Sequence, residues 1–185
     1  MLAPLALGGY TSDTLLSAPK HQPLELHLTA PSTPDAKLHL VKTKGESVEH
    51  VLLKALLWAL LLPTHPDAVC ERDLGLKYRP DVVALDGLAP VWWGECGSVK
   101  PSKLRDLALA FPGCRFSVCK WGRSDLRGYA AGLRKELDLP LRGDYSPPFE
   151  LLNFPTDRLG RFLSDDGELT VFWDDIQSTP LVDPD

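Results

Sequence analysis

Apolar and polar residues alternate in two short stretches near the start of the chain, LELHLTA at residues 24–30 and KLHLVKT at residues 37–43. Alternation with a period of two predicts strands that bury one face. The connecting segment PSTPD is rich in turn-forming residues, so the pattern predicts a β-hairpin over residues 24–45. The preceding residues 1–23 are rich in Pro, Gly and Ser and predict an irregular lead-in.

A long apolar segment follows, ESVEHVLLKALLWALLL at residues 46–62, and its pattern predicts a helix. Ser47 is a suitable N-cap, and Pro63 ends the helical pattern. The segment is apolar around most of its circumference, so we expect the helix to be largely buried. Its longest apolar stretch, residues 51–62, is too short to span a bilayer and contains Lys54.

Strand-like segments and a second helix come next. Leu104, Leu107, Ala108 and Phe111 recur at helical spacing. From residue 46 onward the predicted elements are a helix at 46–62, a strand within 68–79, strands at 81–86 and 90–96, a helix at 101–111 and a strand at 115–121. The order across residues 46–121 is therefore α-β-β-β-α-β.

The last third of the chain, residues 122–185, carries C-terminal additions with weaker patterns. We expect a helix at 125–137, a strand at 149–154, a short helix near 157–163, a strand at 168–173 and a loose acidic tail. The sequence has no internal repeat, and its 185 residues suit a single domain.

Charge is distributed unevenly. The whole chain has a net charge of −5, which is not typical of a basic nucleic-acid-binding protein. Residues 71–142 nevertheless carry a net charge of +4, and the last 43 residues carry −8. The middle of the chain could therefore present a positive face to a polyanion.

The four cysteines, Cys70, Cys96, Cys114 and Cys119, have neither CxxC spacing nor another spacing typical of a zinc site. A chain of this size needs no disulfides for stability, so we expect reduced cysteines and a cytoplasmic protein. The start of the sequence has no basic segment before its short apolar run, so it does not predict a signal peptide.

Three carboxylates occur where burial alone would not place them. Asp81 begins the apolar strand DVVALD, and Glu95 ends the apolar strand PVWWGEC. If these strands are antiparallel neighbours joined by a turn at Gly87, the two acids lie together at one edge of a sheet. Glu49 lies on the apolar side of the first helix. Converging carboxylates repel one another unless a cation holds them, and Mg²⁺ prefers carboxylate oxygens.

Each acid also has an ordinary structural explanation. An aspartate at a strand end commonly caps a turn, and Glu95 could pair with Lys100 or Arg79. Glu49 could be a first-turn acid that the helix dipole favours. Taken together, however, the three acids favour a metal site, where a divalent cation would activate a water and stabilise charge on a phosphoryl oxygen.

The motifs RPDVVALD and VWWGEC, placed between two helices, resemble the PD-(D/E)XK nuclease superfamily. Pro80 and Asp81 match its "PD", Glu95 matches its second acid, and Glu49 matches an acid that many members carry on the first core helix. The segments EHVLLKALLWAL and GECGSVKPSKLRDLA are similar to the YaeQ-like group of that superfamily. The resemblance implies a restriction-endonuclease-like αβββαβ core with a central mixed sheet flanked by helices.

The chain departs from the superfamily signature at one position. The signature places a lysine two residues after the second acid, where this chain has Gly97. Lys100, Lys103 and Lys120 are candidates for a displaced lysine. We expect Lys100 to take this role, because it lies at the start of the second helix near Glu95.

The resemblance implies a Mg²⁺- or Mn²⁺-dependent nuclease acting on DNA or RNA, with DNA as the favoured substrate. Asp81, Glu95 and the Cys96 carbonyl would hold the metal, Glu49 would complete its shell through a water, and Lys100 would assist the nucleophile. Phosphate contacts are expected from five basic side chains, Arg79, Lys103, Arg105, Arg123 and Arg127.

Two alternatives to a nuclease, and the oligomeric state, remain open at this point. The missing lysine and the acidic tail are also compatible with an inactive descendant that binds nucleic acid or a protein partner. A thiol enzyme is less well supported, because no group is evidently placed to lower the pKa of Cys96 or Cys119. Many nucleases of this fold cut as dimers, so a homodimer is an open alternative to a monomer.

Overall fold

A computed structural model describes residues 5–6, 15–17, 21, 23–137 and 149–181. Nine strands form two sheets: β1 (Leu5–Ala6), β2 (Leu24–Thr29), β3 (Lys37–Lys42), β4 (Val69–Cys70), β5 (Val82–Asp86), β6 (Ala89–Cys96), β7 (Arg115–Trp121), β8 (Phe149–Phe154) and β9 (Gln177–Pro180). The main helices are α2 (Val48–Leu61), α3 (Pro101–Ala110), α4 (Leu126–Leu137) and the short α5 (Leu159–Phe162). Two 3₁₀ turns, η1 (Thr156–Arg158) and η2 (Trp173–Asp175), complete the described elements.

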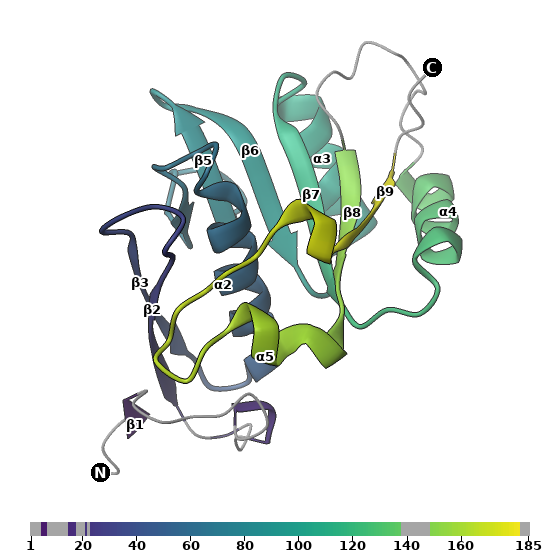
Figure 1. The fold of residues 1–185 in the computed structure, drawn as a ribbon. Helices are drawn as coiled ribbons and strands as arrows, with labels where there is room; N and C mark the ends of the chain where they lie inside the picture. Colours follow the sequence, from purple (N-terminus) through teal and green to yellow (C-terminus); the bar gives the residue numbers. More distant parts are fainter. Residues whose placement is uncertain (1–4, 7–14, 18–20, 22, 138–148, 182–185) are drawn as a thin grey trace.

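The larger sheet is mixed and has the order β4-β5-β6-β7-β8-β9. Strands β4, β5 and β6 are antiparallel neighbours, β6, β7 and β8 run parallel, and β9 returns antiparallel to β8. The predicted element order from residue 46 to residue 121 is therefore present as α2-β4-β5-β6-α3-β7. The predicted α/β fold, with a central mixed sheet flanked by helices, is confirmed (Figure 1).

The smaller sheet has the order β1-β2-β3. Strands β2 and β3 pair antiparallel, which confirms the predicted hairpin. The expectation of an irregular lead-in holds only in part, because Leu5 and Ala6 form β1 and pair in parallel with β2. The structure describes only residues 5–6, 15–17, 21 and 23 of this segment. The expectation for the other residues of 1–23 lies outside the described part of the chain.

Helix α2 lies between the two sheets, as Figure 1 shows. Its N-cap is Ser47, whose hydroxyl accepts a hydrogen bond from the His50 amide, as the sequence predicts. From Val48 to Leu61 all residues are buried except Glu49 and His50, which are half-buried. Burying a helix that is apolar all round requires cover on every side, and the hairpin and the large sheet together provide it.

The two faces of the large sheet carry separate apolar clusters, because successive strand residues point to opposite sides. Trp92 packs with α2, the hairpin and α5, whereas the adjacent Trp93 packs with α3 and α4. The predicted helix 125–137 and strand 149–154 are also present, as α4 and β8. Among the described residues, no helix is long and apolar enough to cross a membrane.

Two predictions for the C-terminal region are wrong. Residues 168–173 do not form a strand, since only isolated bridges occur there, from Glu168 to Thr29 and from Leu169 to Leu163. The last strand, β9, instead overlaps the start of the segment predicted as a loose tail, residues 178–185. Its side chains are mainly exposed, so the sequence has no apolar alternation that would predict this strand. Main-chain hydrogen bonds to the open edge of β8 hold it in place, and the next residue, Leu181, is buried.

Candidate active site

Asp81 and Glu95 are brought together by the pairing of β5 and β6. The expected antiparallel arrangement is present: Val82 pairs with Gly94, and the Asp81 amide donates to the Gly94 carbonyl at 3.1 Å. The turn between the strands contains Gly87 at φ +60°, a conformation that favours glycine. The start of β5 therefore lies beside the end of β6, where the sequence placed both acids.

Asp81 is held in its ionised form by two contacts. Its Oδ2 accepts a hydrogen bond from the Cys96 amide at 2.7 Å, and its Oδ1 lies 3.4 Å from His50 Nε2 on α2. Burial by itself would raise the pKa of Asp81, but the hydrogen bonds from His50 and from the Cys96 amide outweigh it and lower the pKa. Asp81 is therefore available as an anionic ligand at neutral pH.

Glu95 is more deeply buried, at 5% exposed, and contacts the opposite side of the sheet. Its Oε1 accepts from the Trp93 indole N–H at 2.7 Å, and its Oε2 accepts from Lys103 Nζ at 2.5 Å. Burial raises the pKa of Glu95, and the hydrogen bonds from Lys103 and Trp93 only partly offset this increase. The nearby negative charge of Asp81 adds to the increase.

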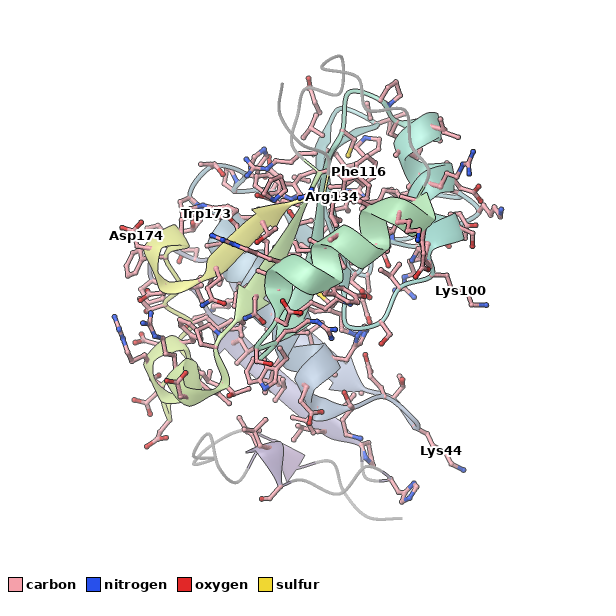
Figure 2. All side chains as sticks on the ribbon, turned by 90° about the vertical axis from the view of Figure 1, so that its right-hand side faces the viewer. Lys44, Lys100, Phe116, Arg134, Trp173 and Asp174 are labelled. Carbon is pink, nitrogen blue, oxygen red and sulfur yellow. The ribbon has the colours of Figure 1, made fainter. Side chains whose placement is uncertain are left out.

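Lys103, rather than Lys100, is the lysine that reaches Glu95. Lys100 is the N-cap residue of α3 and is exposed, and Figure 2 shows it projecting away from the body of the protein. The third candidate, Lys120 on β7, donates to the Gly97 carbonyl and lies 4.7 Å from the centre of the Tyr129 ring. Distance along the sequence favours Lys100, but it does not show which way a side chain leaves the first turn of a helix.

The backbone explains why position 97 carries no lysine. Gly97 has φ +73°, and a Cβ built on it would lie 3.3 Å from His50 Nδ1. A lysine there would have to adopt a left-handed conformation and crowd His50. The turn after β6 therefore favours glycine at position 97. The lysine that contacts Glu95 comes from α3 instead.

Glu49 is half-buried, and its side chain makes no hydrogen bond or ion pair within the described part of the chain. Its carboxylate does not form a close group with those of Asp81 and Glu95: across the residues that the structure describes, no such trio has donor atoms within 4.8 Å of one another. The role predicted for Glu49, a contact with the metal through a water, stays a prediction.

The polar side of α2, formed by His50 and Lys54 with Glu46 just before the helix, approaches Asp81 through His50. His50 lies 3.4 Å from Asp81 and 3.5 Å from Glu46 Oε1, and the pKa of His50 is raised, chiefly by the hydrogen bond to Asp81. One turn further on, the buried Lys54 Nζ donates to Glu46 at 2.5 Å and to Glu71 at 2.6 Å. The i, i+4 spacing of Glu46, His50 and Lys54 was the signal for this network.

Lys54 remains charged although it is buried. Burial lowers its pKa, but the hydrogen bonds to Glu46 and Glu71 outweigh burial and raise it. The same ion pair lowers the pKa of Glu46, although burial alone would raise it. Arg79 also contacts Glu71, through a hydrogen bond of 2.5 Å from Nε to its carbonyl. This connects one predicted phosphate-binding residue to the network behind Asp81.

Of the other predicted nucleic-acid-binding residues, Arg123 has the most defined surroundings. Its guanidinium stacks 3.9 Å from the centre of the Tyr129 ring. Both side chains line a groove of about 530 Å³ between the start of α3 and α4, together with Val99 and Pro101. Lys120 contacts both Tyr129 and Gly97, so the groove adjoins the end of β6. Arg105 and Arg127 are exposed on α3 and α4.

The cysteines are not arranged as a thiol active site. All four are free, as predicted, and Cys96 packs as a small apolar residue among the buried side chains around α2. Burial raises the pKa of the Cys96 thiol well above its usual value, with a further increase from the neighbouring Cys119. Burial also raises the pKa of Cys70, and that of Cys114 to about 12. None of these three thiols is activated as a nucleophile.

Comparison with known proteins gives a likeness in fold. No protein-family model matches the sequence, and no curated protein matches it. Similar solved structures include the YaeQ protein from Xanthomonas axonopodis pv. citri, at 17% identity and a TM-score of 0.56, and the YaeQ protein from Pseudomonas syringae, at 17% identity and a TM-score of 0.52. The first match covers 85% of this chain and 90% of the other, and the second covers 77% and 75%. The chain therefore shares the overall fold of the YaeQ proteins.

Proposed function

We propose that the protein is a metal-dependent nuclease of the PD-(D/E)XK type, which hydrolyses phosphodiester bonds in DNA or RNA. The observation that carries the proposal is the juxtaposition of Asp81 and Glu95 at the ends of β5 and β6, with Lys103 donating to Glu95. The order α2-β4-β5-β6-α3-β7 supports the same superfamily, because it matches the expected αβββαβ core.

Asp81 and Glu95, with the Cys96 carbonyl, would hold Mg²⁺ or Mn²⁺. The donor set fits a hard cation, since carboxylate and carbonyl oxygens are its preferred ligands. The raised pKa of Glu95 also fits, because a buried carboxylate of this kind gains most from a nearby positive charge. When bound, the metal would lower the pKa of a water and neutralise charge on the phosphoryl group.

Lys103 takes the role of the signature lysine from the first turn of α3. Its ammonium lies against Glu95 and is 22% exposed, so it can also reach a substrate oxygen at the mouth of the site. In this role it holds positive charge where negative charge develops during hydrolysis. His50 acts as a positioning residue, because it orients Asp81 and favours its anionic form.

The groove between α3 and α4 would carry the nucleic-acid backbone toward the site. Arg123 and Lys120 supply positive charge around Tyr129, and Arg127 and Arg105 extend this charge over the adjoining helices. Contacts of this type fix a nucleic acid in place without reading its sequence. A duplex DNA is the substrate that we propose to test first.

The test is a cleavage assay over single-stranded, duplex and branched DNA and RNA with Mg²⁺ or Mn²⁺. Asp81→Asn and Glu95→Gln should each lower the rate by more than about 1,000-fold, because each removes a proposed metal ligand. Lys103→Met should lower kcat by about 100-fold with little change in KM, since its role is in the transition state. Lys77→Met is the matched control, because Lys77 is an exposed lysine that pairs with Asp106 on α3 and not with Glu95.

A second candidate is a nuclease-fold protein that binds nucleic acid or a protein partner without cutting. One observation favours it: both oxygens of Glu95 already accept hydrogen bonds, from Trp93 and Lys103, so the acid is satisfied without a metal. If wild-type protein cuts no substrate in the panel but binds one independently of Mg²⁺, or if cutting survives Glu95→Gln, this second function replaces the first.

A further inference from the structure

We propose that the outer face of the β2–β3 hairpin is a Zn²⁺ site formed by Glu25, His27 and His39. Among the residues that the structure describes, this is the one group of three His, Cys, Asp or Glu side chains whose potential ligand atoms all lie within 4.8 Å of one another. It lies on a different sheet from Asp81 and Glu95 and does not depend on the proposed nuclease activity.

The backbone of the hairpin fixes the three side chains on one face. His27 and His39 are directly paired across the two strands, and Glu25 is two residues before His27 on the same strand. Residues two apart on a strand share a face. The alternate residues Leu24, Leu26, Leu28 and Leu40 are buried, which directs the three polar side chains outward.

The donor atoms already converge. Glu25 Oε2 lies 3.8 Å from His27 Nε2 and 3.9 Å from His39 Nε2. These distances are too long for hydrogen bonds, so the carboxylate oxygen is nearly equidistant from the two imidazole nitrogens and is hydrogen-bonded to neither. Tetrahedral zinc with bonds of about 2.0–2.1 Å separates its ligands by roughly 3.3 Å. A contraction of about 0.5 Å would therefore bring the Glu25 oxygen to this separation from each imidazole nitrogen.

The side-chain arrangement allows this contraction. The two imidazole rings are stacked, with centroids 4.5 Å apart and planes 9° from parallel. The histidine side chains are 58% and 52% exposed and that of Glu25 is 29% exposed, which leaves solvent-facing space for the ring rotation that would direct both Nε2 lone pairs at one ion. The exposure also leaves room for a water as the fourth ligand, as in zinc sites with three protein ligands.

The ligand set selects the type of metal. Two imidazoles and one carboxylate suit zinc and related transition metals, whereas Mg²⁺ prefers oxygen ligands alone. A zinc ion here would bridge β2 and β3 at their centre and so stabilise the small sheet. Binding to the folded state alone would raise the melting temperature in proportion to the logarithm of the free zinc concentration.

The experiment uses untagged full-length protein freed of metal by chelation. Calorimetric titration with Zn²⁺ should give one saturable site, and Co²⁺ should give the intense visible absorption of a tetrahedral complex. His27→Gln and His39→Gln should each weaken Zn²⁺ binding by more than about 100-fold, since even the loss of an outer-shell contact costs 10–100-fold. Glu25→Gln should weaken it by about 10-fold or more.

His65→Gln is the matched control, because His65 is not part of the three-residue group and its ring packs edge-on against Trp92 of β6. This variant should bind Zn²⁺ like the wild type. Absence of a saturable site in the wild type, or unchanged affinity in His39→Gln, would overturn the proposal. Nuclease activity in Mg²⁺ should be the same in His39→Gln as in the wild type, so failure of one proposal leaves the other intact.

Discussion

Asp81 and Glu95 are neighbouring carboxylates on paired strands, yet their pKa values shift in opposite directions. Asp81 contacts the α2 side through His50 and receives the Cys96 amide, and its pKa is lowered. Glu95 contacts the α3 side through Lys103 and is more deeply buried, and its pKa is raised. A cationic partner alone therefore does not decide the direction in which a carboxylate pKa shifts. At Glu95, burial raises the pKa more than the lysine at 2.5 Å lowers it.

Environments that push two nearby carboxylates apart are typical of sites where each acid has its own task. Here Asp81 is ionised at neutral pH because its pKa is lowered. Glu95 has a raised pKa, so its ionised form depends on a neighbouring cation. The following four predictions test this division of roles.

The largest effect on stability is expected from Lys54→Met, in the network that supports the Asp81 side. The substitution leaves Glu46 and Glu71 facing each other without the buried ammonium between them. Breaking a buried ion pair in this way should lower the free energy of unfolding by about 3 kcal/mol. Urea denaturation measures it, and Lys77→Met, whose lysine is exposed, should unfold like the wild type.

Lys103→Met should have a smaller effect, on the Glu95 side. Loss of a hydrogen bond to a charged group should cost about 2 kcal/mol at neutral pH. Without the ammonium the pKa of Glu95 should rise further, because the contact with Lys103 is the main influence that lowers it. Since a raised folded-state pKa means that folded Glu95 binds more protons than unfolded Glu95, the loss should shrink as the pH falls toward 4. A loss that is equal at pH 4 and pH 8 would contradict this account.

Gly97→Ala tests whether the turn after β6 requires glycine at position 97. The left-handed backbone at φ +73° and the contact with His50 should together cost about 1–2 kcal/mol. Gly87→Ala provides the control: Gly87 has φ +60° but no atom within 4 Å of an added Cβ. Thermal unfolding of both variants separates the backbone cost from the contact with His50, and equal losses would show that the contact is unimportant.

The smallest effect concerns pH and His50. Its raised pKa means that the interaction with Asp81 stabilises the protein fully below pH 6.5, the usual histidine value, and is lost as the pH rises through the higher folded-state pKa. His50→Gln should therefore cost about 1 kcal/mol at pH 6 and close to nothing at pH 9. Urea midpoints between pH 5.5 and pH 9 measure this slope, and a cost that grows with pH would reverse the assignment.

The sequence predicted most of the fold because its hydrophobic periodicity reports burial. Helix α2, the hairpin, and strands β5 and β6 all have strong patterns and appear where expected. The strand β9 was missed because an edge strand with exposed side chains is held by main-chain hydrogen bonds, which leave no pattern in the sequence. The apparent alternation in residues 168–173 reflects buried Leu169 and Val171 in an irregular segment.

The sequence predicted the acids at the strand ends, Asp81 and Glu95. It did not predict which helix residue, Lys103, contacts Glu95. Strand pairing fixes Asp81 next to Glu95, and a hairpin turn is readable from Gly87. Which lysine meets Glu95 depends on where α3 begins and how its first turn faces the sheet, and neither follows from counting residues. The zinc-site candidate had a readable signal, since equal spacing from the turn aligns His27 with His39.

The burial of α2 between the two sheets has a consequence for how the protein opens. The helix contacts β3 of the small sheet and β4, β5, β6 and β7 of the large one. Neither sheet can separate from it without exposing a continuous apolar surface to water. Opening motions large enough to free the α2 amides would thus require loss of the whole fold, and those amides would exchange with solvent hydrogen at the slowest rate in the molecule. The hairpin and the large sheet would then behave as one cooperative unit, despite sharing no backbone ladder between their strands.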